Sequence, residues 1–362
     1  MRLTVLVILL TSFAFAATNP DPIDGIFTVL KSSNAPGGAV LVKKDGKVVF
    51  QRGYGITDLR SRTRIDVHTN FRLASCTKQF TAMAIMLLVH DGKLHYEDRL
   101  TDVFPDFPAY GKAISVRNLL NHTSGLLDYE DLMPKPDPNL PIDEIQIHDD
   151  GVLTLLKQQK TTKFAPGTHW DYSNSGYVVL GLIVAKVSGE PFDDFLHHQI
   201  FAPLHMSNTV AYVRGKNQVP NRAYGHSKTA SGWAETDQSS TSATLGDGGV
   251  YSSLADLSRW DDALQRHTLL SVKEMEPALT PVRVPDNSVR NPDGSPAQYG
   301  FGWFLNRYRQ HPRMWHYGET EGFRTNIQRF THDGLTIIVL CNRTDLSPGN
   351  LGLKVADLYV SP

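Results

Sequence analysis

Hydrophobic and polar residues alternate along residues 37–56, on either side of Asp45 and Gly46. A period of two residues around an Asp-Gly pair is typical of a β-hairpin, because this pair fits the tight turn between two strands. Residues 71–89 differ, since they would place apolar side chains on every face of a helix and contain neither Gly nor Pro. This second pattern predicts a helix that is buried all round and ends near residues 91–92.

Residues 94–285 are predicted to be mostly helical, with interruptions by loops rich in Pro and Gly. Here and in the rest of the chain the pattern predicts helices at 115–121, 176–187, 255–265 and 350–359, a surface loop at 133–141, and strands at 300–305, 322–330 and 335–341. Strands near both ends with helices between them favour a mixed α/β fold of the α+β type over a doubly wound parallel sheet. We therefore expect an antiparallel sheet from both chain ends, flanked by helices. The expected sheet lobe covers about 20–90 and 286–362, and the inserted helical lobe about 91–285.

The first residues of the chain have the pattern of a secretory signal peptide. A short basic tip, an apolar run over residues 3–13 and the small residues Ala-Phe-Ala at 14–16 form its three parts. We expect residues 1–16 to be removed, a catalytic domain of residues 17–362, and a secreted or periplasmic location. No later stretch reaches the roughly 20 apolar residues that a spanning helix needs, so no membrane anchor is expected.

Charge and cysteine content argue against several classes of protein. Lys and Arg number 36 against 37 Asp and Glu, without a basic stripe, so nucleic acid is not an expected partner. Two cysteines, Cys76 and Cys341, do not make a disulfide framework, and two separate buried thiols are the favoured interpretation. Fourteen histidines include no His-Glu-x-x-His pattern or comparable ligand set, so no metal and no other cofactor is expected.

Ser75 and Lys78, near the start of residues 71–89, are the first chemical candidates. On a helix they would lie on one face, one turn apart, so the amine can reach the serine hydroxyl. A serine becomes a nucleophile when a neighbouring base removes its proton, and a buried lysine can lose its own proton to act as that base. The ordinary alternative is a helix-capping serine beside a surface lysine.

Two further motifs could complete such a site, although each has an ordinary structural alternative. Tyr172 and Asn174 precede the predicted helix at 176–187. A tyrosine near a lysine can have its phenol pKa lowered by the positive charge, which makes the phenolate a candidate base. His316 and Gly318 precede a late strand, where a hydrogen-bonding side chain and a glycine that allows close approach suit an oxyanion site.

Together, Ser-x-x-Lys, Tyr-x-Asn and His-x-Gly in this order resemble the serine β-lactamase-related hydrolases. That family includes class C β-lactamases, D-alanyl-D-alanine carboxypeptidases, D-aminopeptidases and related esterases. Further stretches carry the same resemblance along nearly the whole mature chain: LLNHTSGL at 119–126, FAPGTHWDYSNSGYVVLG at 164–181, PLHMSNT at 203–209, GDGGVYSSLADLSRW at 246–260 and YGFGW at 299–303. The resemblance implies a β-lactamase/transpeptidase-like fold and hydrolysis through an acyl-enzyme.

Carried over to the matching positions, the resemblance assigns a role to each motif residue. It makes Ser75 the nucleophile and Lys78 its proton-transfer partner. Tyr172 becomes the general base for acylation and for activating water in deacylation. Asn174 would orient the substrate amide, and His316 takes the position that a lysine has in class C β-lactamases.

The third motif departs from the Lys-Thr-Gly of class C β-lactamases. The resemblance places the oxyanion hole at the main-chain N–H groups of Ser75 and Glu319, with Tyr317 and Gly318 on the substrate side. Tyr317 replaces a small hydroxyl residue, and Glu319 and Glu321 would repel a substrate carboxylate. The sequence therefore favours an esterase or D-amino-acid peptidase acting on a small ester, amide or peptide, over a β-lactamase or penicillin-binding carboxypeptidase. The alternative from another class is an inactive wall- or peptide-binding protein of the same fold.

Overall fold

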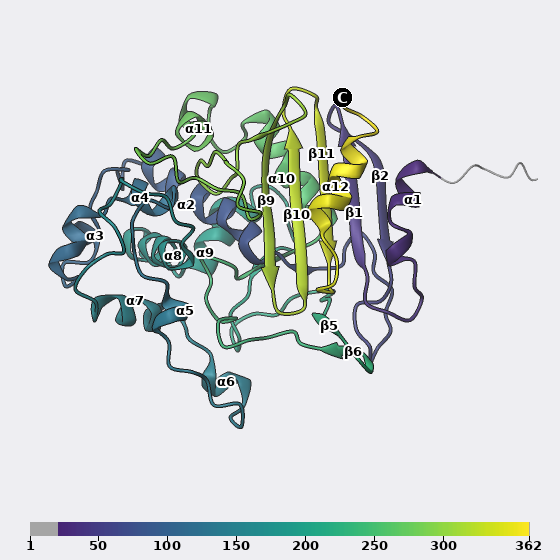
Figure 1. Ribbon diagram of the computed structural model, residues 1–362, viewed down its shortest axis with the longest axis horizontal. Helices are drawn as coiled ribbons and strands as arrows, with labels where there is room; N and C mark the ends of the chain where they lie inside the picture. Colours follow the sequence, from purple (N-terminus) through teal and green to yellow (C-terminus); the bar gives the residue numbers. More distant parts are fainter. Residues whose placement is uncertain (1–20, 362) are drawn as a thin grey trace, which may run out of the picture.

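The computed structural model describes residues 21–361, so the predicted signal peptide lies outside the described residues (Figure 1). Its centre is a six-stranded sheet with the strand order β2-β1-β11-β10-β9-β8, in which all neighbours are antiparallel. The strands are β1 (Gly38–Lys44), β2 (Lys47–Tyr54), β8 (Arg307–Tyr308), β9 (His311–Thr320), β10 (Phe323–Phe330) and β11 (Leu335–Cys341). The predicted antiparallel sheet from both chain ends is therefore confirmed.

The first hairpin shows how local sequence sets this sheet. Asp45 and Gly46 both adopt positive φ, 51° and 75°, as a two-residue hairpin turn requires. In β1, Val40 faces the apolar cluster beneath α1 and α12, whereas Leu41 faces the larger cluster on the helical side. Figure 1 shows α12 in front of the sheet and α10 behind it, so both faces of the sheet are covered. Burial on both faces explains why β1 and β11 are almost continuously apolar.

Two long buried helices form the middle of the helical region. They are α2 (Lys78–His90) and α8 (Asn174–Ser188), which pack against each other, and Gly189 ends α8 with φ 79°. The other helices are α1 (Pro22–Ile26), α3 (Leu100–Val103), α4 (Val116–Leu120), α5 (Tyr129–Leu132), α6 (Ile142–Ile145), α7 (Asp149–Lys157), α9 (Phe192–Leu196), α10 (Leu254–Arg266), α11 (Val272–Leu279) and α12 (Pro348–Ala356). The predicted helices at 115–121, 176–187, 255–265 and 350–359 correspond to α4, α8, α10 and α12.

Short irregular helices and small strands join these elements. The three 3₁₀ turns are η1 (Thr28–Leu30), η2 (Ala74–Thr77) and η3 (Ala109–Ala113), and η4 (His197–Phe201) is a π-helix. A three-stranded sheet consists of β3 (Phe71–Arg72), β7 (Val250–Ser252) and β4 (Val210–Ala211), and a separate hairpin consists of β5 (His226–Thr229) and β6 (Gly232–Glu235). The sequence pattern missed these small strands, because segments of two to four residues are too short for a hydrophobic period.

Two sequence predictions are wrong. The buried helix predicted within residues 71–89 was expected to have Ser75 in its first turn, but Ser75 lies in η2 and α2 begins only at Lys78. Residues 300–305 are not a strand, because only isolated bridges form there and Gly302, with φ 76°, turns the chain toward α2. A side chain at Gly302 would lie 2.9 Å from the Lys78 carbonyl oxygen, so this loop is held by close backbone contact with α2.

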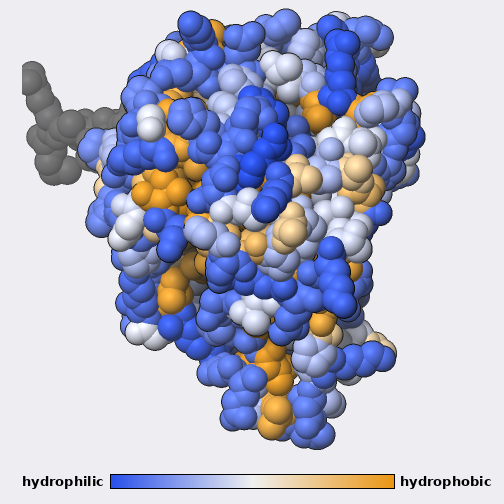
Figure 2. All heavy atoms as spheres, turned by 90° about the vertical axis from the view of Figure 1, so that its left-hand side faces the viewer, coloured by the Kyte–Doolittle hydropathy of each residue, from blue (hydrophilic) through white to orange (hydrophobic). Residues whose placement is uncertain are grey.

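The surface carries few large apolar side chains. Figure 2 shows the face on the left of Figure 1, which is mostly hydrophilic with separate hydrophobic patches. Cys76 and Cys341 are buried free thiols, as expected. Within residues 21–361, none of the helices combines the length and the apolar character needed to cross a membrane.

Candidate active site

Ser75 lies in η2, between β3 and α2. It is the one residue between positions 71 and 86 that is not buried. Ala74, directly before it, adopts φ 48°, a left-handed conformation that is uncommon for a residue with a side chain. The predicted position in the first turn of an α-helix is corrected, since Ser75 lies in a 3₁₀ turn and α2 begins at Lys78. This tight turn exposes the hydroxyl at the edge of an otherwise buried segment.

Lys78 is fully buried directly below Ser75. Its Nζ donates to Ser75 Oγ at 3.0 Å, to Asn174 Oδ1 at 2.8 Å and to the Asp247 carbonyl oxygen at 3.0 Å. All three partners are uncharged oxygens. Burial lowers the pKa of Lys78 from 10.5 to about 8, although Asp247 and other acidic groups nearby partly raise it. At pH 7 about a tenth of the Lys78 amine is therefore neutral, far more than for an ordinary lysine, and it lies next to the serine hydroxyl.

Tyr172 lies beside this pair, with Lys78 Nζ 4.9 Å from the centre of its ring. Its hydroxyl has no hydrogen-bond partner within residues 21–361. Burial raises the pKa of Tyr172 well above 10. The expected lowering of the phenol pKa is therefore wrong, because desolvation of the phenolate outweighs the neighbouring groups. Tyr172 is a neutral phenol in this site.

Asn174, the first residue of α8, connects Lys78 to an acidic residue that the motifs did not include. Its Oδ1 accepts the hydrogen bond from Lys78, and its Nδ2 donates to Glu130 Oε1 at 3.2 Å. The main-chain oxygen of Asp247 also accepts from Lys78, and the Asp247 carboxylate accepts from the Tyr129 hydroxyl at 3.2 Å. Glu130 and Asp247 were missed as site residues, although Asp247 lies in one of the family-like stretches.

His316 is fully buried in β9. Its Nδ1–H donates to the Tyr317 carbonyl oxygen at 2.6 Å, and its Nε2 accepts from the Tyr299 hydroxyl at 3.2 Å. Burial lowers the pKa of His316 to about 3, so the ring is neutral. With both nitrogens engaged, this side chain supports the wall of the site and does not line the cavity next to Ser75.

Gly318 allows β9 to pack closely against the segment that leads into η2 and Ser75. A side chain at Gly318 would lie 2.1 Å from the Leu73 carbonyl oxygen, so only glycine allows this approach. Ser75 and Glu319, the predicted oxyanion-hole residues, both line a cavity of about 60 Å³. Tyr317 is half-buried against an aromatic cluster and lines a different cavity of about 430 Å³ on the α12 side.

A wider opening of about 470 Å³ lies next to the small cavity, with which it shares Glu130, Glu319, Thr241 and Thr320. Its charged side chains are Glu130, Glu319, Glu321 and Arg324. Three carboxylates against one guanidinium make this opening acidic. Such a surface attracts a cationic group of a substrate and repels an anionic one.

His122, which was not predicted as a site residue, forms hydrogen bonds with the segment that carries Tyr172. Its carbonyl oxygen accepts from the Asp171 N–H at 3.0 Å, and its Nδ1 accepts from the Ser173 N–H at 3.1 Å. Its ring lies 4.4 Å from the Tyr172 ring, and its backbone has φ 61°. A non-glycine residue in this conformation is retained only where its surroundings fix it. His122 therefore bonds the residues on both sides of Tyr172, and the LLNHTSGL stretch was its only signal in the sequence.

Comparisons with known proteins agree with this geometry. The family model described as Beta-lactamase matches residues 24–359. Penicillin-binding protein 4* of Bacillus subtilis (strain 168) is 33% identical over 332 residues, which cover 88% of this chain and 71% of that protein. The D-aminopeptidase of Brucella anthropi is 29% identical over 85% of this chain, which spans only 56% of that relative.

A solved structure shows the same likeness in three dimensions. The D-amino acid amidase from Ochrobactrum anthropi SV3, complexed with D-phenylalanine, superposes with a TM-score of 0.77 at 25% identity. The match covers 93% of this chain and 98% of that one. It confirms the β-lactamase/transpeptidase-like fold that the resemblance implied. Because the family model matches almost the whole chain, the protein belongs to the Beta-lactamase family and is a serine hydrolase of that family.

Proposed function

We propose that this hydrolase cleaves amide or ester bonds of small substrates that carry a free amino group, as an aminopeptidase or amidase. The acidic opening formed by Glu130, Glu319 and Glu321 is the observation that carries this proposal. A substrate ammonium group gains from three nearby carboxylates, whereas a substrate carboxylate is repelled. The buried, neutral His316 supplies no positive charge that would offset this repulsion.

Ser75 and Lys78 carry out the acyl transfer in this proposal. Neutral Lys78 takes the hydroxyl proton while Ser75 Oγ attacks the substrate carbonyl carbon, and the Ser75 and Glu319 N–H groups stabilise the resulting oxyanion. Collapse of this intermediate breaks the bond to the leaving amine or alkoxide. The neutral Tyr172 phenol is suited to pass a proton to this leaving group and to regain one from Lys78. Water then hydrolyses the acyl-enzyme, with Lys78 as the base.

Two parts of the proposal rest on other observations. The likeness to a D-aminopeptidase and to a D-amino acid amidase supports a preference for D-amino-acid substrates. The pattern of residues 1–16 supports export through a cleaved signal peptide. Mass spectrometry of the protein recovered from a secreting host tests export, since a mature N-terminus at Ala17 is expected.

A substrate panel tests the proposed specificity. We expect kcat/KM for D-phenylalanine amide to exceed that for its N-acetyl derivative and that for L-phenylalanine amide by at least about tenfold, roughly 1.4 kcal/mol each. A p-nitrophenyl ester should likewise exceed a chromogenic cephalosporin by at least about tenfold. The variant Glu321→Gln should reduce the preference for the free amine without changing turnover of the neutral ester.

Other outcomes distinguish the alternatives. Faster opening of the cephalosporin than of the ester would show a β-lactamase instead. Failure of a serine-reactive fluorophosphonate to label Ser75 would indicate a binding protein that has lost catalysis.

A further inference from the structure

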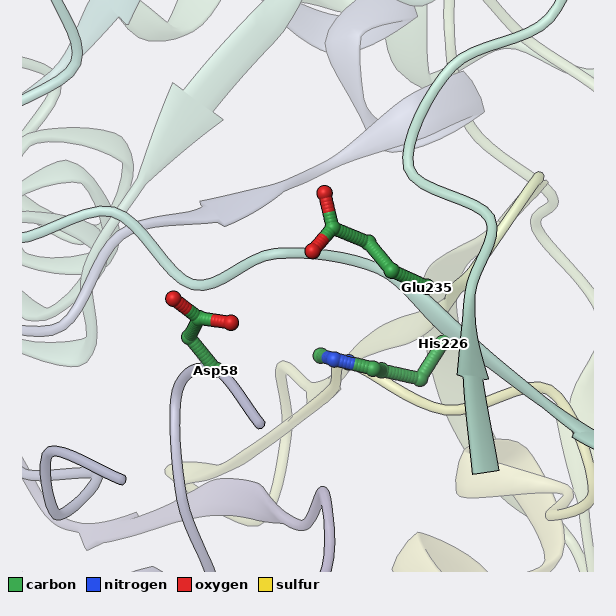
Figure 3. A group of neighbouring side chains, drawn as sticks. All are labelled: Asp58, His226 and Glu235. Carbon is green, nitrogen blue, oxygen red and sulfur yellow. The ribbon is translucent and has the colours of Figure 1, made fainter. Parts of the chain in front are cut away.

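Asp58, His226 and Glu235 come together away from the Ser75 cavity. Asp58 lies in the loop after β2, whereas His226 and Glu235 face each other across the β5–β6 hairpin. One potential ligand atom from each residue lies within 4.8 Å of the other two. Figure 3 shows the two carboxylates and the imidazole ring pointing toward a common space. Segments that are far apart in the sequence thus bring three metal-binding side chains together.

The His226 ring lacks the partners that a buried imidazole normally has. The residue is 0% exposed, and neither ring nitrogen has a hydrogen-bond partner within residues 21–361. Its position is fixed from the backbone, where its N–H donates to the Gly322 and Asn342 carbonyl oxygens at 3.2 and 3.1 Å. Buried polar atoms are nearly always bonded, so an imidazole with both ring nitrogens unpaired is unusual. An ion bound to the ring would account for this arrangement.

Arg60 is the cation that now contacts the two carboxylates. Its Nε lies 3.1 Å from Asp58 Oδ1, and its Nη2 lies 3.1 Å from Glu235 Oε2. The Arg60 side chain is 63% exposed, so it reaches the carboxylates from the solvent side and can swing away at little cost. It makes no hydrogen bond to His226 in the described part of the chain. Arg60 therefore balances charge without satisfying the imidazole.

We propose that Asp58, His226 and Glu235 bind a divalent transition-metal ion, with Zn²⁺ as the best match. A neutral imidazole suits zinc better than magnesium or calcium, and two carboxylates balance the charge of the ion. Zinc bonds to nitrogen and to carboxylate oxygen are about 2.0–2.2 Å long, so two ligands on one ion lie up to about 4 Å apart. The observed spacing needs only a small closure of the three side chains, and water completes the coordination.

The ion would fix one wall of the acidic opening. It would join the β5–β6 hairpin to the loop after β2. Gly225, directly before β5, contacts the turn between β9 and β10, where a side chain at Gly322 would lie 2.3 Å from the Gly225 Cα. That turn follows Glu319 by only a few residues. The inferred role is therefore structural, in support of the strand that carries Glu319, and it is independent of the proposed substrate.

Calorimetric titration of the chelator-treated full-length protein with zinc chloride tests the site. We expect one zinc ion per chain and a higher melting temperature in its presence. Glu235→Gln and His226→Ala should each weaken zinc binding by at least about tenfold. Arg60→Ala should strengthen it, because the competing cation is removed. Magnesium and calcium should bind more weakly than zinc.

The matched control is His95→Ala, which removes an exposed histidine that lies outside the cluster and should leave zinc binding unchanged. Glu235 is partly exposed, so Glu235→Gln keeps the test valid even if His226→Ala fails to fold. The proposal is wrong if the wild-type protein binds no zinc. It is also wrong if zinc binding survives in Glu235→Gln and His226→Ala. Loss of stability in Arg60→Ala without any zinc binding would identify Arg60 as the permanent partner of both carboxylates.

Discussion

Lys43 and Lys78 are both buried, but only the surroundings of Lys78 suit a catalytic base. Lys43 Nζ lies 2.9 Å from Asp261 and 2.7 Å from Asp262, so its charge is compensated by carboxylates. Lys78 is buried at least as deeply but donates only to uncharged oxygens. Burial without a counter-charge lowers the pKa of Lys78 to about 8 and makes it available as a base. Burial alone does not indicate a reactive amine, whereas burial without a paired carboxylate does.

A sizeable cavity beside a buried lysine does not make that lysine reactive. Lys43 and Asp261 line a cavity of about 410 Å³, comparable in size to the acidic opening of about 470 Å³ near Ser75. The pKa of Asp261 lies below its usual value, because the charges of Arg329 and Lys43 outweigh the opposite effect of burial. This carboxylate therefore stays ionised. Among the described residues, no serine or cysteine lines this cavity, so Lys43 has no nucleophile of that kind to activate.

The largest effect should come from removing the nucleophile on the Lys78 side. Ser75→Ala should reduce kcat by at least about 10⁴-fold and leave the fold intact, because only the oxyanion hole and substrate binding remain. Intact-protein mass spectrometry should show one acyl adduct on the wild-type protein and none on the variant. An adduct at another residue would refute the role of Ser75.

Replacing each lysine by methionine tests directly whether the two lysines have different roles. Lys78→Met should lower kcat about 10³-fold with an unchanged or higher melting temperature, because a buried amine without a counter-charge is replaced by an apolar group. Lys43→Met should leave Asp261 and Asp262 with Arg329 as their remaining nearby cation and cost about 3 kcal/mol in the free energy of unfolding. Turnover by the Lys43 variant should stay near wild type at temperatures where it is folded. Equal effects of both variants on kcat and on stability would show that the two sites do not differ as argued.

Tyr172→Phe removes a single hydroxyl next to Lys78 and should have a smaller effect. Loss of one proton-transfer group reduces kcat by about 10²-fold, while KM should change little. The loss should be greater for an amide than for a p-nitrophenyl ester, because an amine leaving group needs a proton and p-nitrophenolate does not. An equal loss for both substrates would assign Tyr172 to activation of the nucleophile instead.

Local patterns were enough to predict much of the fold. The hairpin around Asp45 and Gly46 depends on a turn of two residues, and the Ser75–Lys78 contact depends on a spacing of three residues. Both features can therefore be predicted from residues that are close together in the sequence. The predicted strand at 300–305 failed because its apolar residues belong to a loop held by backbone contact at Gly302.

Properties that depend on the folded surroundings could not be predicted in the same way. The phenol pKa of Tyr172 was expected to fall because a lysine is near, but burial, which the sequence does not show, raises it. Glu130 and His122 reach the site from loops and short helices whose position depends on tertiary contacts. Asp58 lies more than 160 residues before both His226 and Glu235, so no motif spacing connects the three residues.

The variant Asn174→Asp would give Lys78 a carboxylate neighbour, as Lys43 has in the wild-type protein. This change places a carboxylate oxygen at the position of the amide oxygen that now lies 2.8 Å from Lys78 Nζ. A neighbouring negative charge stabilises the ammonium form, so the pKa of Lys78 should rise by about one unit or more. In the wild-type protein, kcat/KM for a neutral ester should increase as pH rises through about 8, because the neutral amine is the active form. In the variant this increase should move to higher pH, which lowers activity at pH 7 by about tenfold.

Stability provides a second measurement of the same shift. The pKa of Lys78 in the folded protein, about 8, lies below its ordinary value of 10.5. The unfolded chain therefore binds more protons between these two pH values, and the wild-type free energy of unfolding should rise with pH across this window. In Asn174→Asp the two pKa values are closer, so this rise should be smaller. Asn139→Asp, which adds the same charge on an exposed loop, should change neither profile. A pH–rate profile that stays in place in Asn174→Asp would mean that Lys78 does not set the pH dependence, and the contrast between the two buried lysines would then not explain catalysis.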